Sequence, residues 1–345
     1  MKPGNQLEAD PAIEKAAQYI TAGQVVAVPT ETVYGLAGDA TDPSAINRIF
    51  AAKNRPSDNP LIVHLSNLDM VHRYCLEVDP RVAILAEAFW PGPLTMVLKA
   101  GKVLRETVCR GLDTVAVRIP DHPVIQALIT RVDRGLAAPS ANLSGKPSPT
   151  TAKAVLYDLQ GRIPLILDGG PCRVGLESTV LDMSGDEPVI LRPGLVTPGP
   201  LSEVLGSEIR YVTDDEARRR SPGTRYRHYS PDARVLLLAP DVTDSCRMTL
   251  LEFLKARDKT GYIGSRVTPP AEVHYDRQTP KTLPANLYSS LRAMDNAQIN
   301  AVVVDGVAID DQGLGLMDRL IKAASCYFHN DSEAETWMEA PSSPD

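Results

Sequence analysis

Residues 24–36 read QVVAVPTETVYGL. The run QVVAVP (24–29) is short and mostly apolar, which predicts a buried strand. The stretch PTETVYGL (29–36) follows at once and brings three hydroxyl side chains and a glycine to the end of that strand. Such a stretch suits the lining of a polar pocket. Taken alone, however, an ordinary transition from strand to turn explains it better.

The segments around this strand predict a mixed α/β sheet. Asp10-Pro11 is typical of an N-cap and the first helical residue, and Asp42 and Asp79 each precede proline in the same way. Strands are predicted for LIVHL (61–65), TMVLK (95–99), TVAVRIP (114–120), GLAAP (135–139), PLILD (164–168), STVLDM (178–183) and PVILRP (188–193). So many strands with few helices between them favour a mixed sheet over a doubly wound parallel one.

The composition changes after about residue 205. Residues 210–233 contain few apolar side chains, which is typical of a linker. Beyond them RVLLLAP, GYIGS and NAVVVDG alternate with helical patterns, which predicts a small Rossmann-like α/β domain. We expect a catalytic domain over 9–205, a linker over 206–233 and a second domain over 234–330. The acidic stretch 331–345 is expected to be disordered.

Composition restricts the class of protein. The chain has 345 residues, 43% of them apolar, and a formal charge of −7, which excludes a disordered chain and argues against broad charge-driven binding to nucleic acid. No run approaches 18 uncharged apolar residues, and the N-terminus has no apolar signal segment. The five cysteines never form CxxC, and the histidines lack metal-site spacing. We expect a cytoplasmic protein without a structural metal or a membrane partner.

Standard nucleotide motifs are missing from the sequence. Neither GxxxxGK[ST] nor GxGxxG after a strand occurs. A nucleotide would therefore have to be bound by charged side chains and hydroxyl groups.

Cations stand at the ends of predicted elements. Lys53 and Arg55 end a predicted helix, where two positive charges also complement the helix dipole. In TVAVRIP, Val115 and Val117 share one face of the strand, so Arg118 lies on the other face near its end. A surface arginine at a strand end is an equally good interpretation of Arg118 alone.

Three further stretches add hydroxyl groups and charge. APSANLSGKPSPT (138–150) is rich in serine, and such loops suit phosphate or carboxylate groups, although a plain N-cap loop is common. ESTV (177–180) and LRPG (191–194) contribute Ser178 and Arg192. The linker core SPGTRYRHYSP (221–231) carries Arg225, Arg227 and His228 among tyrosines and no acid. Together these residues predict one cationic, hydroxyl-rich pocket with a basic flap, and a nucleotide is the natural candidate ligand.

These motifs resemble a known family. They are PTETVYGL, Lys53-Asn54-Arg55, NPLIVH, TVAVRIPDHP, Ser140-Ala141-Asn142, ESTV and LRPG, and together they resemble the YrdC-like domain of threonylcarbamoyl-AMP synthase. The linker core and LGLMDRLIKAA resemble the long, two-domain form of that enzyme. The resemblance implies a twisted, mixed YrdC-like sheet, followed by the smaller C-terminal domain.

The resemblance also implies an activity. The family condenses L-threonine, bicarbonate or CO2, and ATP into threonylcarbamoyl-AMP and releases pyrophosphate. The resemblance further implies that Lys53 and Arg55 are catalytic. It also implies that Mg²⁺ accompanies ATP, with ligands that the sequence does not reveal. The product would pass to a tRNA threonylcarbamoyl-transferase complex, and any contact with tRNA itself is expected to be weak.

The residues of both binding sites follow from the same resemblance. L-threonine is expected to contact Thr32, His64, Arg118, Ala138 (through its backbone) and Ser178. ATP is expected to contact Arg55, Asn59, Thr114, Ser140, Asn142, Ser148, Arg192 and Tyr229.

Two other interpretations stay open. One is a non-catalytic RNA-binding module of the same fold, against which stand the charge of −7 and the lack of aromatic RNA-stacking motifs. The other is a carbamoyltransferase-type YrdC-like domain, whose zinc-finger-like cysteines do not occur here.

Overall fold

The structure is a computed structural model that describes residues 10–212 and 229–339. The chain divides into two compact units, of which the first comprises residues 1–144 and 148–226. The second comprises 145–147 and 227–345, so the main division falls inside the predicted linker. Residues 213–228, which include Arg225, Arg227 and His228 of the predicted flap, lie outside the described part of the chain.

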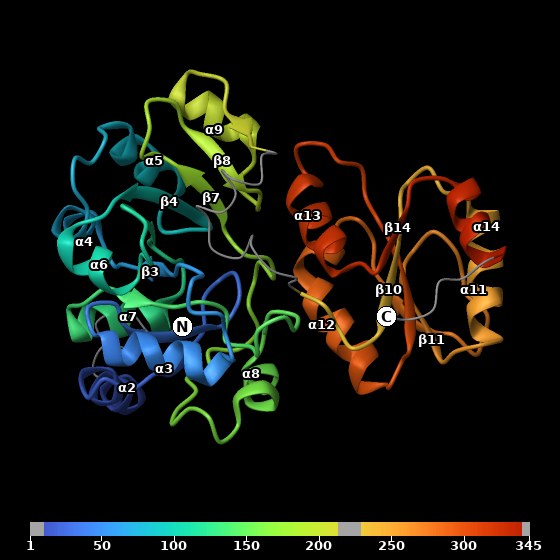
Figure 1. The fold of residues 1–345 in the computed structure, drawn as a ribbon, viewed down its shortest axis with the longest axis horizontal. Helices are drawn as coiled ribbons and strands as arrows, with labels where there is room; N and C mark the ends of the chain where they lie inside the picture. The colour runs from blue at the N-terminus through green and yellow to red at the C-terminus, as the bar shows by residue number, and fades with distance from the viewer. Residues whose placement is uncertain (1–9, 213–228, 340–345) are drawn as a thin grey trace. The chain divides into compact units, whose positions relative to one another are not determined.

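The first unit contains a nine-stranded sheet in the order β1-β2-β6-β3-β5-β4-β7-β8-β9 (Figure 1). Neighbouring strands run parallel in the pairs β3/β5, β4/β7 and β8/β9 and antiparallel in the others, which confirms the predicted mixed sheet. The strands are β1 (Val26–Val28), β2 (Gly35–Asp39), β3 (Ile62–His64), β4 (Leu94–Lys99), β5 (Thr114–Arg118), β6 (Leu136–Ala137), β7 (Thr179–Asp182), β8 (Val189–Arg192) and β9 (Arg210–Tyr211).

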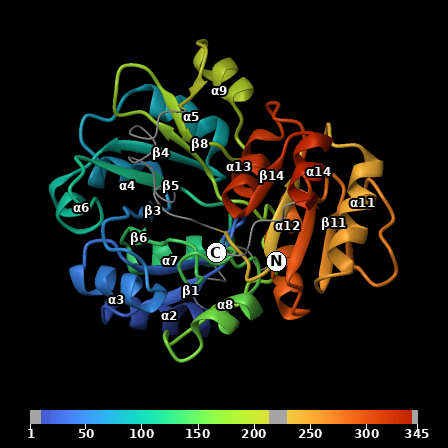
Figure 2. The same cartoon turned by 45° about the vertical axis from the view of Figure 1, so that its right-hand side comes forward.

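Asp10 and Asp42 cap helices as predicted, whereas the helix after Asp79 begins only at Arg81, with Pro80 at the N-cap and no side-chain cap. The side chain of Asp10 accepts a hydrogen bond from the Ala12 amide at 2.9 Å, and that of Asp42 accepts one from the Ser44 amide at 2.8 Å. Helices α2 and α7 lie side by side in both views (Figure 1, Figure 2). The helices are α2 (Pro11–Thr21), α3 (Pro43–Lys53), α4 (Leu68–Tyr74), α5 (Arg81–Phe89), α6 (Lys102–Thr107), α7 (Pro123–Val132), α8 (Ala152–Leu159) and α9 (Pro198–Leu205).

The two faces of β5 pack against different partners. Val115 and Val117 belong to the main hydrophobic core of the unit. Ala116 belongs to a smaller apolar cluster with Val97, Val180 and Leu191. The predicted alternation along TVAVRIP is thereby confirmed, and Arg118 shares the face of Ala116.

One predicted strand is wrong. Within PLILD (164–168), pairing is limited to an isolated bridge between Ile166 and Ala27. This stretch lies beside the edge strand β1, where Ala27 donates to the Leu165 carbonyl at 3.0 Å and accepts from the Leu167 amide at 2.9 Å.

The segment GLAGD (35–39) has low β-propensity, yet it forms β2 because β1 and β6 pair with it on both sides.

The second unit is built on a five-stranded, fully parallel sheet in the order β12-β11-β13-β10-β14. Helices α12 and α13 cover one face of this sheet, and α11 and α14 cover the other (Figure 1). This arrangement confirms the predicted alternating α/β domain. The elements are β10 (Arg234–Leu238), α11 (Asp244–Lys255), β11 (Thr260–Gly264), β12 (His274–Arg277), α12 (Leu283–Asn296), β13 (Ala301–Asp305), α13 (Leu314–Ala323), β14 (Cys326–Phe328) and α14 (Asp331–Glu339).

The acidic stretch that begins at residue 331 is not disordered along its described part. Residues Asp331–Glu339 form helix α14, so the prediction of disorder is wrong there. The Asp331 carboxylate accepts hydrogen bonds from the amide and hydroxyl of Thr243 at 2.7 and 2.6 Å, and Trp337 packs on Phe253 and Phe328. These tertiary contacts outweigh a local composition that is typical of a disordered tail.

Across the described parts of both units, no helix has the length and apolar character needed to cross a membrane.

Candidate active site

The carboxyl ends of β3 and β5 bring His64 and Arg118 together. The two strands are parallel neighbours, and His64 is the register partner of Arg118. Both side chains are buried. Burial, together with the positive charge of Arg118, lowers the pKa of His64 to about 3. His64 is therefore a neutral imidazole beside a buried cation.

The guanidinium group of Arg118 is held by the stretch that follows β1. Its Nη1 donates to the Thr32 hydroxyl at 3.0 Å, and its Nε donates to the Gly92 carbonyl at 3.0 Å. The hydroxyls of Thr30 and Thr32 are 2.8 Å apart, so they continue this chain of hydrogen bonds. PTETVYGL thus places buried hydroxyl groups beside Arg118, and its role as the lining of a polar pocket stays a prediction.

Glu31 is a functional candidate that the sequence analysis missed. It is 2% exposed, and its Oε1 lies 2.5 Å from Nη2 of Arg118. The contact lacks hydrogen-bond geometry, and neither carboxylate oxygen accepts a hydrogen bond within the described parts of the chain. Arg118 balances the charge of this buried carboxylate, while the oxygens retain acceptor positions that suit a donor group on a ligand. In the sequence, the one feature that could have indicated this role is that Glu31 is an acidic residue inside a hydroxyl-rich stretch at the end of a strand.

Ser178 and Arg192 meet at the start of β7 and the end of β8. Arg192 donates to the Ser178 carbonyl from Nη2 at 2.9 Å and from Nε at 3.2 Å. The Ser178 hydroxyl is 2.7 Å from that of Thr95 on β4. Both predicted residues are buried, and the structure brings them together.

The serine-rich loop 138–150 runs along the stretch that leads into β2. The Leu36 amide donates to the Pro139 carbonyl at 2.7 Å, and the Tyr34 amide donates to the Pro149 carbonyl at 2.8 Å. An isolated bridge joins Gly35 to Ser140. The predicted polar stretches PTETVYGL (29–36) and APSANLSGKPSPT (138–150) therefore lie against each other.

Lys53 is the last residue of α3 and is fully buried beneath this loop. Its Nζ donates to the carbonyls of Ser140 and Asn142, the latter at 2.6 Å, and to Oδ1 of Asn142 at 3.5 Å. Burial and the nearby charge of Arg55 hold the pKa of Lys53 well below its usual range. The ammonium group therefore fixes the loop that carries three of the predicted ATP contacts, Ser140, Asn142 and Ser148.

Ser148 and Asn59 are buried, and their contacts with ATP stay predictions. The Ser148 hydroxyl donates to Oε1 of Glu177 at 2.6 Å. Ala138 donates from its amide to the Ile62 carbonyl at 3.0 Å, beside the strand that ends at His64. Arg55 is half-buried and donates to the Pro60 carbonyl at 3.3 Å.

One predicted ATP residue of the first unit lies away from Arg118. Thr114 begins β5 and Arg118 ends it, so about 13 Å of strand separates them. Tyr229 belongs to the second unit, where its ring lies 5.4 Å from that of Tyr288. Their contacts with ATP stay predictions.

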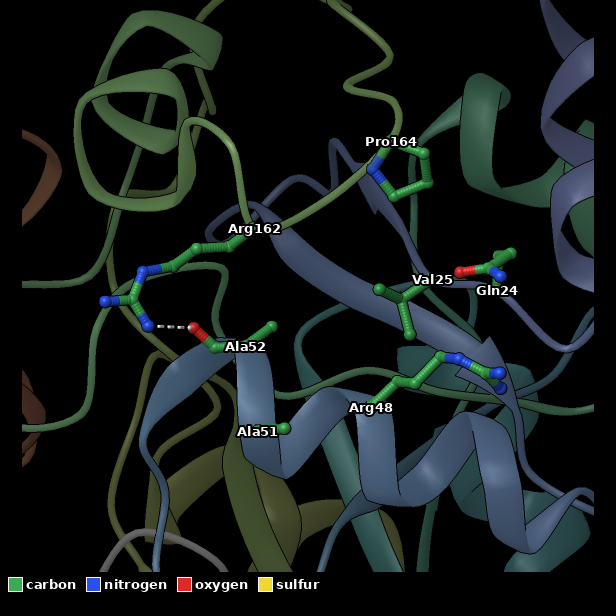
Figure 3. Close-up of a pocket in the computed structure, with 7 residues that line it drawn as sticks. All are labelled: Gln24, Val25, Arg48, Ala51, Ala52, Arg162 and Pro164. Atoms are coloured by element: carbon green, nitrogen blue, oxygen red, sulfur yellow. Dashed lines mark hydrogen bonds between the residues drawn. The ribbon is translucent and has the colours of Figure 1, made fainter.

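A shallow pocket of about 300 Å³ lies beside α3 (Figure 3). Arg162 lies at one edge of the pocket and donates from Nη1 to the Ala52 carbonyl at 3.4 Å and to Oδ1 of Asn54 at 3.3 Å (Figure 3). Arg48 donates to the Gly23 carbonyl at 2.7 Å. Both arginines therefore donate hydrogen bonds to backbone carbonyls. Those of Arg162 stabilise the C-terminal end of α3, where Lys53 lies and which Arg55 follows.

Comparison with known proteins decides the family. Residues 18–194 match the family model described as "Telomere recombination", and residues 196–325 match "Threonylcarbamoyl-AMP synthase, C-terminal domain". Threonylcarbamoyl-AMP synthase from Pyrococcus abyssi is 42% identical over 321 residues, which cover 90% of this chain and 94% of that protein. The chain belongs to the threonylcarbamoyl-AMP synthase family.

Other members of the threonylcarbamoyl-AMP synthase family agree in length and fold. The Bacillus subtilis protein is 39% identical over 324 residues, covering 91% of this chain and 93% of its own. A crystal structure of P. abyssi Sua5 complexed with L-threonine superposes with a TM-score of 0.85 at 41% identity, covering 92% of this chain and 96% of that one. The likeness spans both predicted domains.

Proposed function

We propose that this protein joins L-threonine, bicarbonate or CO2, and ATP into threonylcarbamoyl-AMP and pyrophosphate. One observation carries the proposal from the structure: the buried Arg118, at the paired ends of β3 and β5, lies between Thr32, Glu31 and the neutral His64. An arginine in such a place suits the carboxylate of an amino acid. Membership of the family supports the same substrate.

The first chemical step joins the threonine amine to CO2. The bound ammonium group first releases one proton to solvent and becomes the amine. The amine nitrogen then forms a bond to the carbon of CO2, one C–O π pair moves onto oxygen, and a second proton leaves to solvent, which gives the N-carboxylate. Glu31 is the nearest buried carboxylate to Arg118, so we assign it to the threonine ammonium group while Arg118 takes the carboxylate. A buried pair of opposite charges thereby matches both ends of a zwitterion.

In the second step a carboxylate oxygen attacks the α-phosphorus of ATP, the new O–P bond forms, and pyrophosphate leaves. Two anions must approach each other, so cations near the phosphates lower the barrier. We assign this role to Arg55 and Arg192, while Lys53 adds its charge from beneath the Ser140–Asn142 turn.

Mg²⁺ is proposed as the partner of ATP. Within residues 10–212 and 229–339, no group of three or more acidic, histidine or cysteine side chains forms a metal cage. That fits an ion carried chiefly by substrate phosphates, which needs only one or two protein carboxylates. Glu177, hydrogen-bonded to Ser148, is the carboxylate placed to take part, and the ion would neutralise phosphate charge.

Pyrophosphate release tests the proposed function. The full chain is incubated with ATP and Mg²⁺, with and without L-threonine and bicarbonate. We expect release that requires both and falls when serine replaces threonine. Release independent of threonine contradicts the proposal, and intact tRNA binding without turnover would favour the RNA-binding interpretation.

We further propose that the product is consumed by a tRNA-modifying transferase in the cytoplasm.

Replacing Lys53 by methionine or Arg55 by alanine is expected to slow pyrophosphate release by about 100-fold or more in each case. The two changes should differ in stability. Lys53→Met leaves the buried acceptors on Ser140 and Asn142 without their donor and should lower the Tm, whereas Arg55 is only half-buried and its loss should change the Tm little.

Thermal melting by circular dichroism and initial rates measure both effects. Lys15→Met, the same substitution at an exposed position of α2, is the matched control and should alter neither. A full rate in both site variants would remove these residues from the mechanism.

A further inference from the structure

The connections between the parallel strands of the second unit reverse direction at one place. From β10 the chain runs through α11 to β11, on one side of β10 in the sheet. From the neighbouring β13 it runs through α13 to β14, on the opposite side. Helices α11 and α13 accordingly cover opposite faces (Figure 1). In open α/β sheets, ligands bind beyond the carboxyl ends of the strands at such a reversal.

A cavity of about 670 Å³ lies at this edge of the sheet. Its size falls in the range of small-molecule and cofactor sites. Residues that follow β10, β11, β12 and β13 all contribute to its wall. The lining comprises Pro240, Ser265, Arg266, Gln278, Pro280, Lys281, Leu283, Pro284, Asp305–Ala308, Asp310, Gln312, Gly313 and Leu316.

The floor of the cavity is a fully paired ionic network. Asp305, at the end of β13, accepts hydrogen bonds from Nε of the completely buried Arg247 at 2.9 Å and from the Tyr262 hydroxyl at 2.6 Å. A Cβ at Gly264 would lie 2.2 Å from Oδ2 of Asp305, so glycine is needed there for the carboxylate to approach. The network makes a rigid floor whose own charges are balanced.

The rim carries positive charge above apolar walls. Lys281 is exposed, and in the described part of the chain its ammonium group donates no hydrogen bond and pairs with no acid. Arg266 also lines the cavity; its guanidinium group pairs with Asp244 at 3.0 Å and donates from Nη1 to the Pro240 carbonyl at 3.2 Å. Three prolines, at 240, 280 and 284, supply flat apolar surface suited to a ring. The lining also carries the negative charge of Asp310, whose Oδ1 accepts hydrogen bonds from the amides of Gln312 and Gly313.

We propose that this cavity is a second nucleotide site, which binds a nucleoside monophosphate with its phosphate at Lys281 and Arg266 and its base against the prolines. The topology explains where the site lies, the volume accommodates a ligand of this size, and the rim and walls match its anionic and aromatic parts. This site is additional to the ATP site proposed in the first unit and does not depend on it.

The test counts bound AMP per full-length chain by equilibrium dialysis to saturation. Ala308→Trp places an indole at the cavity, whereas Ile309→Trp changes an exposed neighbour that is not part of the lining. Both positions are exposed, so neither tryptophan must enter the core. We expect Ala308→Trp to bind one AMP fewer than the wild type and Ile309→Trp to bind the same number.

This difference of one site is expected whether or not the first unit also binds AMP, so it separates the inference from the proposed function. Lys281→Glu should weaken AMP binding at this site about tenfold or more, as expected for loss of a charge-assisted hydrogen bond. Arg277→Glu makes the same change of charge on β12 outside the lining and should have little effect. Equal AMP counts in the two tryptophan variants, or equal weakening by the two charge reversals, would overturn the proposal.

Discussion

Replacing Arg118 by glutamine is expected to lower kcat/KM for L-threonine by about 100- to 1000-fold, because truncating one partner of a buried charge pair costs about 2–5 kcal/mol. The variant loses the donor that we assign to the threonine carboxylate. It also leaves the Glu31 carboxylate buried without its cation. Initial rates of pyrophosphate release at varied threonine measure the effect, and KM for ATP should change far less.

Glu31→Gln supplies the matched comparison. It removes the opposite charge of the same pair, and we expect KM for threonine to rise while the ATP dependence is retained. The double variant removes both buried charges, so its Tm should recover relative to either single variant, although turnover should not. A variant of Arg118 that keeps its threonine dependence would show that the carboxylate binds elsewhere.

Replacing Arg247 by methionine is expected to destabilise the second unit by about 3–5 kcal/mol, the usual cost of breaking a buried ion pair by removing one partner. Arg247 is completely buried, pairs with Asp305 at 2.9 Å, and donates to the Ala239 carbonyl at 3.1 Å. Methionine fills similar space but satisfies none of these acceptors. Asp305 would then retain a buried negative charge that lacks its main counterion.

The two tryptophans of the chain allow this effect to be assigned to one unit. Trp337 packs within the second unit and Trp90 within the first, so a Trp90→Phe background leaves Trp337 as the only indole. Urea unfolding followed by its fluorescence should show the loss. Arg257→Met, at an exposed position just beyond α11, is the control and should cost less than about 1 kcal/mol. An unchanged midpoint for Arg247→Met would contradict a stabilising role for the pair.

Local patterns predicted much of the framework. Asp10 and Asp42 cap helices because an N-cap acts within two or three residues of itself. The alternation of Val115, Ala116 and Val117 assigned both faces of β5 because side chains along a strand alternate with period two. The same reasoning placed Arg118 at the edge where the site lies.

Other features depend on partners that are distant along the chain. GLAGD becomes a strand only because β1 and β6 pair with it, and the acidic helix α14 forms because Thr243 and Phe253 hold Asp331 and Trp337. No local pattern reports such contacts, since composition and propensity describe a residue and its neighbours alone.

The sequence by itself determined the strand and helix framework, the cationic character of the site and the resemblance to a family. Only the tertiary structure decided that Glu31 lies against Arg118 and that Arg247 pairs with Asp305. It also decided that the Lys53 ammonium group donates hydrogen bonds to the Ser140–Asn142 turn. The physical reason is that a charge is tolerated in the interior only beside its partner. Those partners come from segments dozens of residues apart, which the fold alone brings together.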